Sequence, residues 1–181
     1  MKVSKEKVAE HRQAILNAAG KLFRERGFDD VTVAQVMKEA GLTHGAFYGY
    51  FPSKEALIAE AVGSALTPDP SKPRNAAARY ADNYLSGAHR DHRDDSCMFS
   101  SLGTEASRGS DALRHTMTAS LRHQIERFTP EAEGATPEEK RRNAIAAWAA
   151  MVGAIVLARI ADDKALSDEI LSATRNALPF A

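Results

Sequence analysis

Between Thr32 and Lys54 the chain carries a close series of side chains that can bind a polyanion. Hydroxyl, imidazole and ammonium groups recur there, and such groups donate hydrogen bonds to phosphate oxygens and base edges. His44 can reach a base acceptor or a phosphate, and Ala46 can touch a thymine methyl group. The candidate DNA contacts are Thr32, Gln35, Thr43, His44, Gly45, Ala46, Tyr48, Tyr50 and Lys54.

Two short helices with a glycine turn between them are expected to position these side chains. Thr32 can cap the first helix, and Gln35 three residues later completes a capping box. Gly41 can adopt the left-handed conformation that ends a helix. Thr43 can then cap a second helix over about 44–50. This arrangement predicts a helix-turn-helix, whose second helix enters the major groove of DNA.

Several of these residues have a structural interpretation beside the functional one. Gln35 serves as a cap partner rather than a base reader in the simpler interpretation, and Tyr50 can either pack or contact DNA. Gly45 weakens a short helix by about 1 kcal/mol relative to alanine. A glycine kept at this cost indicates that the helix must approach the DNA closely there. Phe47 and Phe51 are expected to pack inside the predicted DNA-binding head, residues 1–54.

A longer set of residues surrounds this motif at fixed spacing. It comprises Ile15-Leu16-x-Ala18-Ala19, Leu22-Phe23-x-x-x-Gly27-Phe28, Thr32, Ala40-Gly41-Leu42-Thr43, Gly45, Phe47-Tyr48-x-Tyr50-Phe51 and Ser53-Lys54-Glu55-Ala56-Leu57. Through these residues the stretch from about 8 to 66 resembles the TetR family of bacterial transcriptional regulators. The resemblance implies that Tyr48 and Lys54 grip phosphates. Gly49 lacks the larger side chain of many relatives, so we expect that it reads no base.

The periodicity of the apolar residues predicts an all-α fold of about nine helices. Besides the two helices of the motif, the expected helices span about 7–26, 53–66, 74–90, 97–107, 110–128, 137–161 and 167–178. Residues 1–54 form the predicted DNA-binding head, with a connecting helix at 53–66. The three prolines between Thr67 and Pro73 cannot continue a helix, so the second domain is expected to cover 67–181.

Composition restricts the class of protein. The chain has 181 residues, of which 44% are hydrophobic and 27% charged, and a single cysteine excludes an internal disulfide framework. Its longest apolar run, Ala144 to Ala158, is shorter than the roughly 20 residues that cross a bilayer. No signal-peptide pattern is present at the N-terminus. These features predict a cytoplasmic protein. We expect no cofactor.

The charges are distributed unevenly although they sum to zero. Residues 1–54 hold nine Lys and Arg against six Asp and Glu, and the rest of the chain holds fifteen against eighteen. A mildly basic head on an acidic body suits a protein that touches DNA at one end. Chance fluctuation explains so small a difference equally well.

The helix expected at 137–161 is the best candidate for a homodimer interface. Its centre is apolar nearly all round, and Gly153 and Ala154 permit close helix contact. One head buries too little surface for tight specific binding, whereas a two-fold dimer reads both halves of a palindrome. The family resemblance implies a four-helix interface, in which the helix at 167–178 joins this one. Burial of the helix within one subunit is the alternative.

The resemblance also implies that a small molecule enters the C-terminal domain and changes the spacing of the two heads. Aromatic, methionine and leucine side chains suit both an adaptable pocket and an ordinary core. The candidate pocket residues are Tyr80, Tyr84, Met98, Phe99, Leu102, Met117, Leu121, Trp148 and Met151.

Cys97 lies at the start of the helix expected at 97–107 and is a possible redox residue. A thiol at a helix N-terminus can react with oxidants or electrophiles, although the neighbouring Asp94 and Asp95 oppose its ionisation. A small buried apolar residue is the alternative. His89 and His92, three residues apart, can lie on one helix face and bind zinc, but a polar loop explains them equally well, and we predict no metal.

These features favour a dimeric repressor that a small-molecule inducer releases from a palindromic operator. A thiol-based redox or electrophile sensor using Cys97 is an alternative, and a helical ligand carrier without DNA binding is a more remote one. An enzyme using Cys97 and a histidine is not expected, because no base, acid and oxyanion hole occur at a defined spacing.

Overall fold

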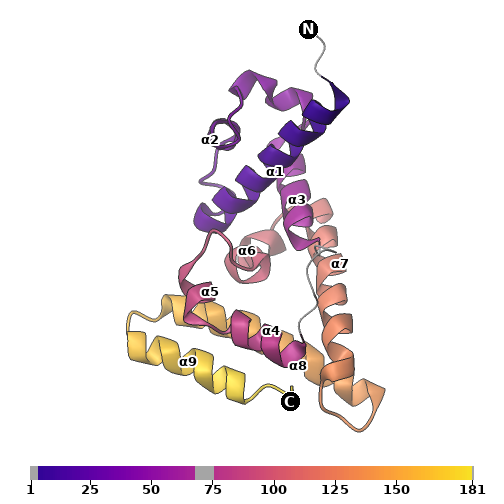
Figure 1. Cartoon of the computed structure of the whole chain (residues 1–181), viewed down its shortest axis with the longest axis vertical. Coiled ribbons are helices and arrows are strands. Elements are labelled where there is room, and N and C mark those ends of the chain that lie inside the picture. The colour runs from indigo at the N-terminus through magenta and orange to yellow at the C-terminus, as the bar shows by residue number, and fades with distance from the viewer. Residues whose placement is uncertain (1–3, 68–75, 181) are drawn as a thin grey trace. The chain divides into compact units, whose positions relative to one another are not determined.

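The computed structural model describes residues 4–67 and 76–180, and every regular element within these two ranges is helical (Figure 1). The α-helices are α1 (Lys5–Arg26), α2 (Val33–Glu39), α3 (Lys54–Leu66), α4 (Ala77–Tyr84), α5 (Gly87–Asp91), α6 (Met98–Ser107), α7 (Asp111–Phe128), α8 (Pro137–Ile160) and α9 (Lys164–Asn176). Two 3-10 helices, η1 (His44–Gly49) and η2 (Thr129–Glu131), complete the described part. The predicted all-α fold is therefore confirmed.

The chain divides into two compact units. The first comprises Met1–Pro68 together with Ser101–Thr118, and the second comprises Asp69–Ser100 with Ala119–Ala181. The division therefore cuts through α6 and α7, so that the second half of α6 belongs with the N-terminal helices. The predicted break at Pro68–Pro73 lies outside the described residues.

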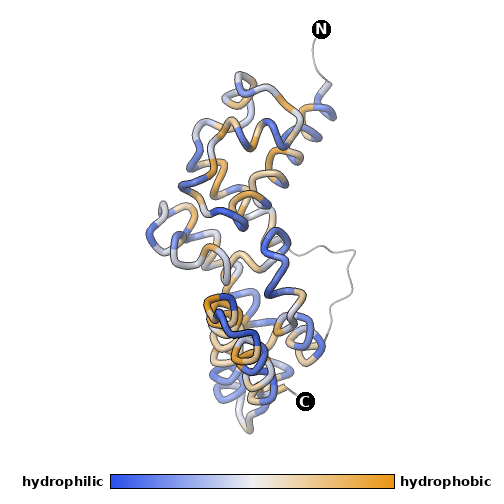
Figure 2. The backbone as a smooth tube through the Cα atoms, turned by 90° about the vertical axis from the view of Figure 1, so that its left-hand side faces the viewer, coloured by the Kyte–Doolittle hydropathy of each residue, from blue (hydrophilic) through white to orange (hydrophobic). Residues whose placement is uncertain are grey.

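The first unit is built around α1, which packs against α2 and α3. Ile15, Ala19 and Phe23 are fully buried on the inward side of α1. Along these N-terminal helices, apolar and polar stretches alternate, as the colours of Figure 2 show. Ser4 caps the start of α1 by accepting a hydrogen bond from Lys7 N–H, and Gly27 with φ 83° ends it. This helix gives the first unit a rigid frame.

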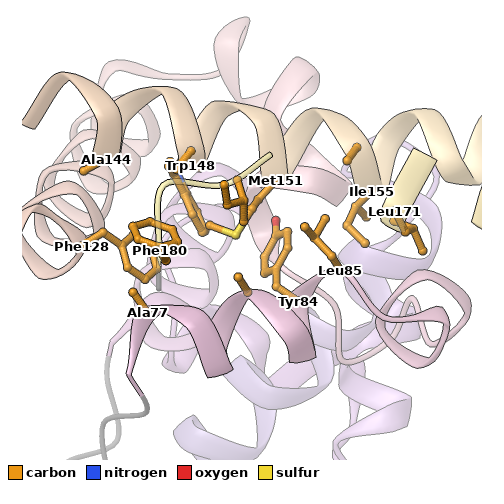
Figure 3. Packing of buried hydrophobic residues seen from close by; sticks show 14 of the residues in the cluster. Ala77, Tyr84, Leu85, Phe128, Ala144, Trp148, Met151, Ile155, Leu171 and Phe180 are labelled. Carbon is orange, nitrogen blue, oxygen red and sulfur yellow. The ribbon is translucent and has the colours of Figure 1, made fainter. Parts of the chain in front are cut away.

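The second unit has a core of aromatic and small residues between α4 and α8 (Figure 3). Trp148, the sole tryptophan, lies at its centre on α8. The ring centroids around it are 5.5 to 6.4 Å away and belong to Tyr80, Tyr84, Phe99 and Phe128. At the C-terminal end of the chain, Phe180 packs against Phe128 at 5.6 Å. Edge-to-face and tilted aromatic pairs of this kind stabilise a core beyond their buried area.

The start of α8 follows the local sequence signals. Thr136 and Glu139 form the expected capping box, and Pro137 occupies the first turn. Of the described helices, α8 has the length and composition to cross a membrane, with a mean hydropathy of 1.7 in its most apolar window and 39% of that window buried. Its bounds agree with the helix expected at 137–161, which extends beyond the apolar run from Ala144 to Ala158 at both ends.

Two predicted helices have different bounds in the structure. The helix expected at 74–90 is interrupted after Tyr84, because Ser86 accepts a hydrogen bond from His89 N–H and so begins α5 as a separate helix. The last helix begins at Lys164 with Asp163 as its cap, rather than at Ser167. Ser167 is buried instead and donates a hydrogen bond to the carbonyl oxygen of Ala158.

Candidate nucleic-acid interface

The first helix of the predicted motif begins with the expected capping box. Thr32 N–H donates to Gln35 Oε1 at 2.8 Å, and Gln35 N–H donates to Thr32 Oγ1 at 3.3 Å. The Thr32 hydroxyl also donates to Gln35 Oε1 at 3.0 Å. The carbonyl oxygen of the Gln35 side chain is thus engaged within the protein, which supports its interpretation as a cap partner.

The turn between α2 and η1 depends on the backbone of Gly41. This residue has φ 71°, and its N–H donates to the carbonyl oxygen of Lys38 while Leu42 N–H donates to that of Met37. These two bonds form a Schellman motif, which ends a helix at a left-handed residue. A Cβ atom on Gly41 would meet nothing within 4 Å, so its conformation rather than crowding requires glycine.

The recognition segment is a 3-10 helix rather than the expected α-helix. The predicted side-chain cap by Thr43 is wrong, because the hydroxyl makes no capping hydrogen bond. In the tighter 3-10 helix, Ala46 N–H donates to the Thr43 carbonyl oxygen at 3.1 Å. This N–H is therefore not available to the Thr43 hydroxyl. The Thr43 hydroxyl is left exposed on the surface of the head.

Within η1 only Phe47 is buried, and most of its other residues are exposed. Phe47 is fully buried, and its ring stacks on Phe51 with the centroids 6.0 Å apart. Tyr48, next in the chain, is 72% exposed. The same exposed side carries Thr43, His44, Gly45 and Gly49, with Ala46 half-buried beside them. The buried rings hold the segment while the outward donors face solvent.

The two glycines of η1 leave room around its exposed side. A Cβ atom on either Gly45 or Gly49 would meet nothing within 4 Å, and neither residue has a positive φ. Nothing in the described head itself therefore requires glycine at these two positions. Close approach of Gly45 to a groove stays a prediction.

Tyr50 differs from Tyr48 because its hydroxyl has a partner within the protein. Tyr50 Oη lies 2.9 Å from His11 Nδ1, and the two rings pack edge to face. This pair joins α1 to the end of η1, and the pattern of the motif did not indicate His11. A role for Tyr50 at DNA stays a prediction, whereas its contribution to packing is visible.

Lys54 is the first residue of α3, directly after its cap. Ser53 Oγ accepts a hydrogen bond from Ala56 N–H at 3.1 Å, as the sequence predicts. Together the ammonium group and the positive end of the helix dipole make this helix start electropositive. Hydrogen bonding to its own backbone and to Ser53 lowers the pKa of the exposed Glu55 carboxyl. The helix start is therefore suited to an anion, consistent with a phosphate contact by Lys54.

Glu105 is a further residue that the motif did not indicate. It lies on α6 in the same unit as the head, and its Oε2 accepts a hydrogen bond from Phe28 N–H at 2.6 Å. The residues are 77 positions apart in the sequence. No local pattern reveals such a contact.

The second unit contains a cleft of about 600 Å³ beside Cys97. Tyr80 and Tyr84, two of the nine predicted pocket residues, line it together with Asn83, His89, Asp95, Ser96 and Cys97. The other seven lie mainly in the core: Met98, Leu102, Met117, Trp148 and Met151 are buried, and Phe99 and Leu121 pack against buried residues. Leu102 and Met117 belong to the first unit, apart from the rest.

Hydrogen bonding fixes the state of His89 in this cleft. Its Nδ1 lies 2.7 Å from the Tyr84 carbonyl oxygen, and its Nε2 accepts the N–H of Cys97 at 3.0 Å. Burial lowers the pKa of the imidazole, which is consistent with a neutral ring. Since both ring nitrogens are engaged, His89 is not placed to take the Cys97 thiol proton. Among the described residues, no group of three or more His, Cys, Asp and Glu side chains could hold a metal.

One side of α8 and α9 is apolar and exposed. Ile145, Leu157 and Ile160 on α8 and Leu166 on α9 are 44% to 72% exposed. Between them Gly153 is only partly covered, and a Cβ atom there would meet nothing within 4 Å. We call the surface formed by these five residues the α8–α9 face. Exposed apolar patches of this kind are typical of interaction sites.

Comparison with known proteins identifies the helix-turn-helix. Residues 15–61 match the family of bacterial regulatory proteins called the tetR family. The helix-turn-helix region therefore belongs to the TetR family. Among curated relatives, YdgC of Bacillus subtilis, an uncharacterized HTH-type transcriptional regulator, is 47% identical over 58 residues, which are 32% of this chain and 30% of YdgC. The HTH-type transcriptional repressor BepR of Brucella suis is 38% identical over 68 residues, 38% of this chain and 32% of BepR. The matches thus span about a third of these relatives.

Solved structures share the fold of nearly the whole chain. A TetR-family regulator from Agrobacterium tumefaciens superimposes with a TM-score of 0.73 at 18% identity, covering 95% of this chain and 99% of that one. The reduced form of Escherichia coli NemR superimposes with a TM-score of 0.68 at 21% identity, covering 93% of this chain and 94% of that one. At these identities the likeness shows the fold alone.

Proposed function

We propose that this TetR-family chain is a transcriptional repressor that binds double-stranded DNA through η1. The observation that carries the proposal is the exposed side of η1, where Tyr48 and His44 face solvent while Phe47 anchors the helix. Hydroxyl and imidazole donors on a short helix that also contains two glycines suit contacts to phosphates and base edges. The site of action is the cytoplasm, where the bacterial chromosome lies.

A homodimer through the α8–α9 face completes the proposed repressor. Two copies of α8 and α9 would cover each other's exposed apolar side chains, and Gly153 permits close backbone approach. A two-fold pair would present two heads to a palindromic operator. The regions predicted for this role, 137–161 and 167–178, include most of the face.

The cleft beside Cys97 is the proposed entrance for a small-molecule inducer. Its walls are the stacked rings of Tyr80 and Tyr84, and Trp148 lies 5.5 Å behind Tyr84. A molecule that binds this unit better in its DNA-free state would release the operator. The alternative of a redox or electrophile sensor at Cys97 stays a prediction, because the nearby His89 is engaged through both nitrogens.

Tyr48→Phe is expected to weaken operator binding without destabilising the fold. The substitution removes one exposed hydroxyl, whose hydrogen bond to a phosphate contributes about 1.5–3 kcal/mol. Each protomer should therefore lose roughly 10- to 150-fold in affinity. The measurement is a fluorescence-anisotropy titration of a duplex that the wild-type chain selects from a random library, with the thermal midpoint recorded for each variant.

The matched control is Tyr50→Phe, which removes the same atom from a tyrosine two residues away. Its hydroxyl bonds to His11 inside the head, so this variant should lower the thermal midpoint more than Tyr48→Phe does. Equal DNA affinity of Tyr48→Phe and wild type would contradict the assigned phosphate contact. A carrier that has lost DNA binding, the more remote alternative, would select no duplex at all.

A further inference from the structure

Glu105 is an acidic residue of α6 whose side chain lies against the turn that follows α1. Besides accepting the short hydrogen bond from Phe28 N–H, the carboxylate sits beside Gly27. A Cβ atom built on Gly27 would lie 2.6 Å from Glu105 Oε1, closer than real Cβ contacts come. Gly27 therefore provides the space in which the carboxylate reaches the backbone.

Phe28 is held from two sides. Its N–H donates to the carboxylate of Glu105, and its ring packs edge to face on Phe23 of α1, with the centroids 5.3 Å apart. Phe28 is 6% exposed, so its N–H would lie in a poorly hydrated site if the carboxylate were removed. A charged acceptor for a buried backbone N–H makes a shorter and stronger hydrogen bond than a neutral one.

The turn at Gly27 and Phe28 leads directly into the helix-turn-helix. Phe28 is followed after four residues by Val33, the first residue of α2. The other fixed points of the head are the α1–α3 packing, with its ion pair between Arg12 and Glu60, and the bond between His11 and Tyr50. The bond from Glu105 adds a fixed point at the opposite end of α1.

We propose that Glu105 is a positioning residue for operator binding. Its bond to Phe28 N–H fixes the path of the chain from α1 into α2, and so the orientation in which η1 meets a groove. Glu105 touches no DNA in this role. The inference rests on the proposed function, since operator affinity is one of its two readouts.

Three substitutions separate the hydrogen bond from the charge. E105A removes the acceptor, E105D keeps the charge but shortens the reach by one methylene, and E105Q keeps a neutral acceptor. We expect E105A and E105D to bind the duplex selected by the wild-type chain about tenfold more weakly, since each leaves a buried donor unsatisfied. E105Q should stay within about threefold of wild type, because a neutral acceptor makes a weaker bond of the same geometry.

The second readout is hydrogen exchange at the Phe28 amide, measured by NMR on the free protein. Exchange should accelerate at least about tenfold in E105A and E105D, and much less in E105Q, since the bond that protects this amide is lost only in the first two. This readout needs no DNA, and E105D and E105Q keep the experiment decisive if E105A does not fold.

Glu131 supplies a matched control in the other unit. Its Oε2 accepts a hydrogen bond from Ala77 N–H at 2.7 Å, the same carboxylate-to-backbone contact between residues distant in the sequence. E131A should lower the thermal midpoint but leave operator affinity unchanged. If E131A lost as much operator affinity as E105A, the loss would reflect general destabilisation of the protein. That result would overturn the proposal.

Two further results would overturn it. One is a folded E105A or E105D variant that binds the operator as tightly as wild type, and the other is an E105Q variant as weak as E105A. A wild-type chain that selects no duplex is a different outcome, because it overturns the proposed function itself.

Discussion

Leu157→Glu is expected to abolish both dimerisation and operator binding while each protomer stays folded. Leu157 is 56% exposed on α8, so a glutamate there is solvated in the free protomer. In a two-fold interface it would be buried without a partner, and burying an unpaired carboxylate costs several kcal/mol. Dimer affinity should fall more than about 100-fold. Analytical ultracentrifugation measures it, and circular dichroism reports the fold.

The control variant is Ala119→Glu, which introduces the same side chain at an exposed helical position of α7. It should remain dimeric and bind DNA as wild type does. A Leu157→Glu protein that still sediments as a dimer would show that the α8–α9 face does not mediate self-association.

Enlarging Gly45 is expected to separate stability from DNA binding. A Cβ atom has open space there and φ is not positive, so Gly45→Ala should stabilise the head by roughly 0.4–1 kcal/mol. Operator affinity should fall progressively in Gly45→Ala and Gly45→Leu. A leucine that holds η1 away from the groove removes base contacts of about 1–3 kcal/mol each, so we expect a loss of at least roughly 100-fold.

Gly103→Ala is the matched control for this series. Gly103 is a helical glycine of α6 in the same unit, and a Cβ atom there also meets nothing within 4 Å. Its variant should gain similar stability and keep wild-type affinity. Thermal melts and anisotropy titrations measure both quantities. Unchanged affinity in Gly45→Leu would mean that this side of η1 does not enter a groove.

Local signals in the sequence predicted the helices and the motif well. The capping boxes at Thr32 and Thr136 use side chains three residues apart, and the left-handed Gly41 ends α2 through bonds within one turn. These interactions form between near neighbours, so the sequence shows them directly. The apolar spacing also placed Phe47 and Phe51 in the core, as the structure confirms.

The contacts that support the site could not be predicted, because they join distant residues. Tyr50 bonds to a histidine 39 positions earlier, and Glu105 reaches Phe28 across 77 positions. The sequence did not predict that the helix expected at 74–90 ends after Tyr84. The apolar spacing continues through this point, whereas the Ser86 hydroxyl caps a new helix. Helical spacing also could not separate pocket from core: Met151 is fully buried, whereas Tyr80 lines the cleft.

In the proposed complex η1 meets duplex DNA twice through a symmetric pair, and selection from a random duplex library tests this most directly. The purified wild-type chain should enrich inverted repeats, whose half-sites lie about one helical turn or a multiple of it apart, and should bind them with two or more copies. Its affinity should fall steeply as salt rises. Enrichment of no sequence, or of a single half-site bound by one copy, would contradict the account.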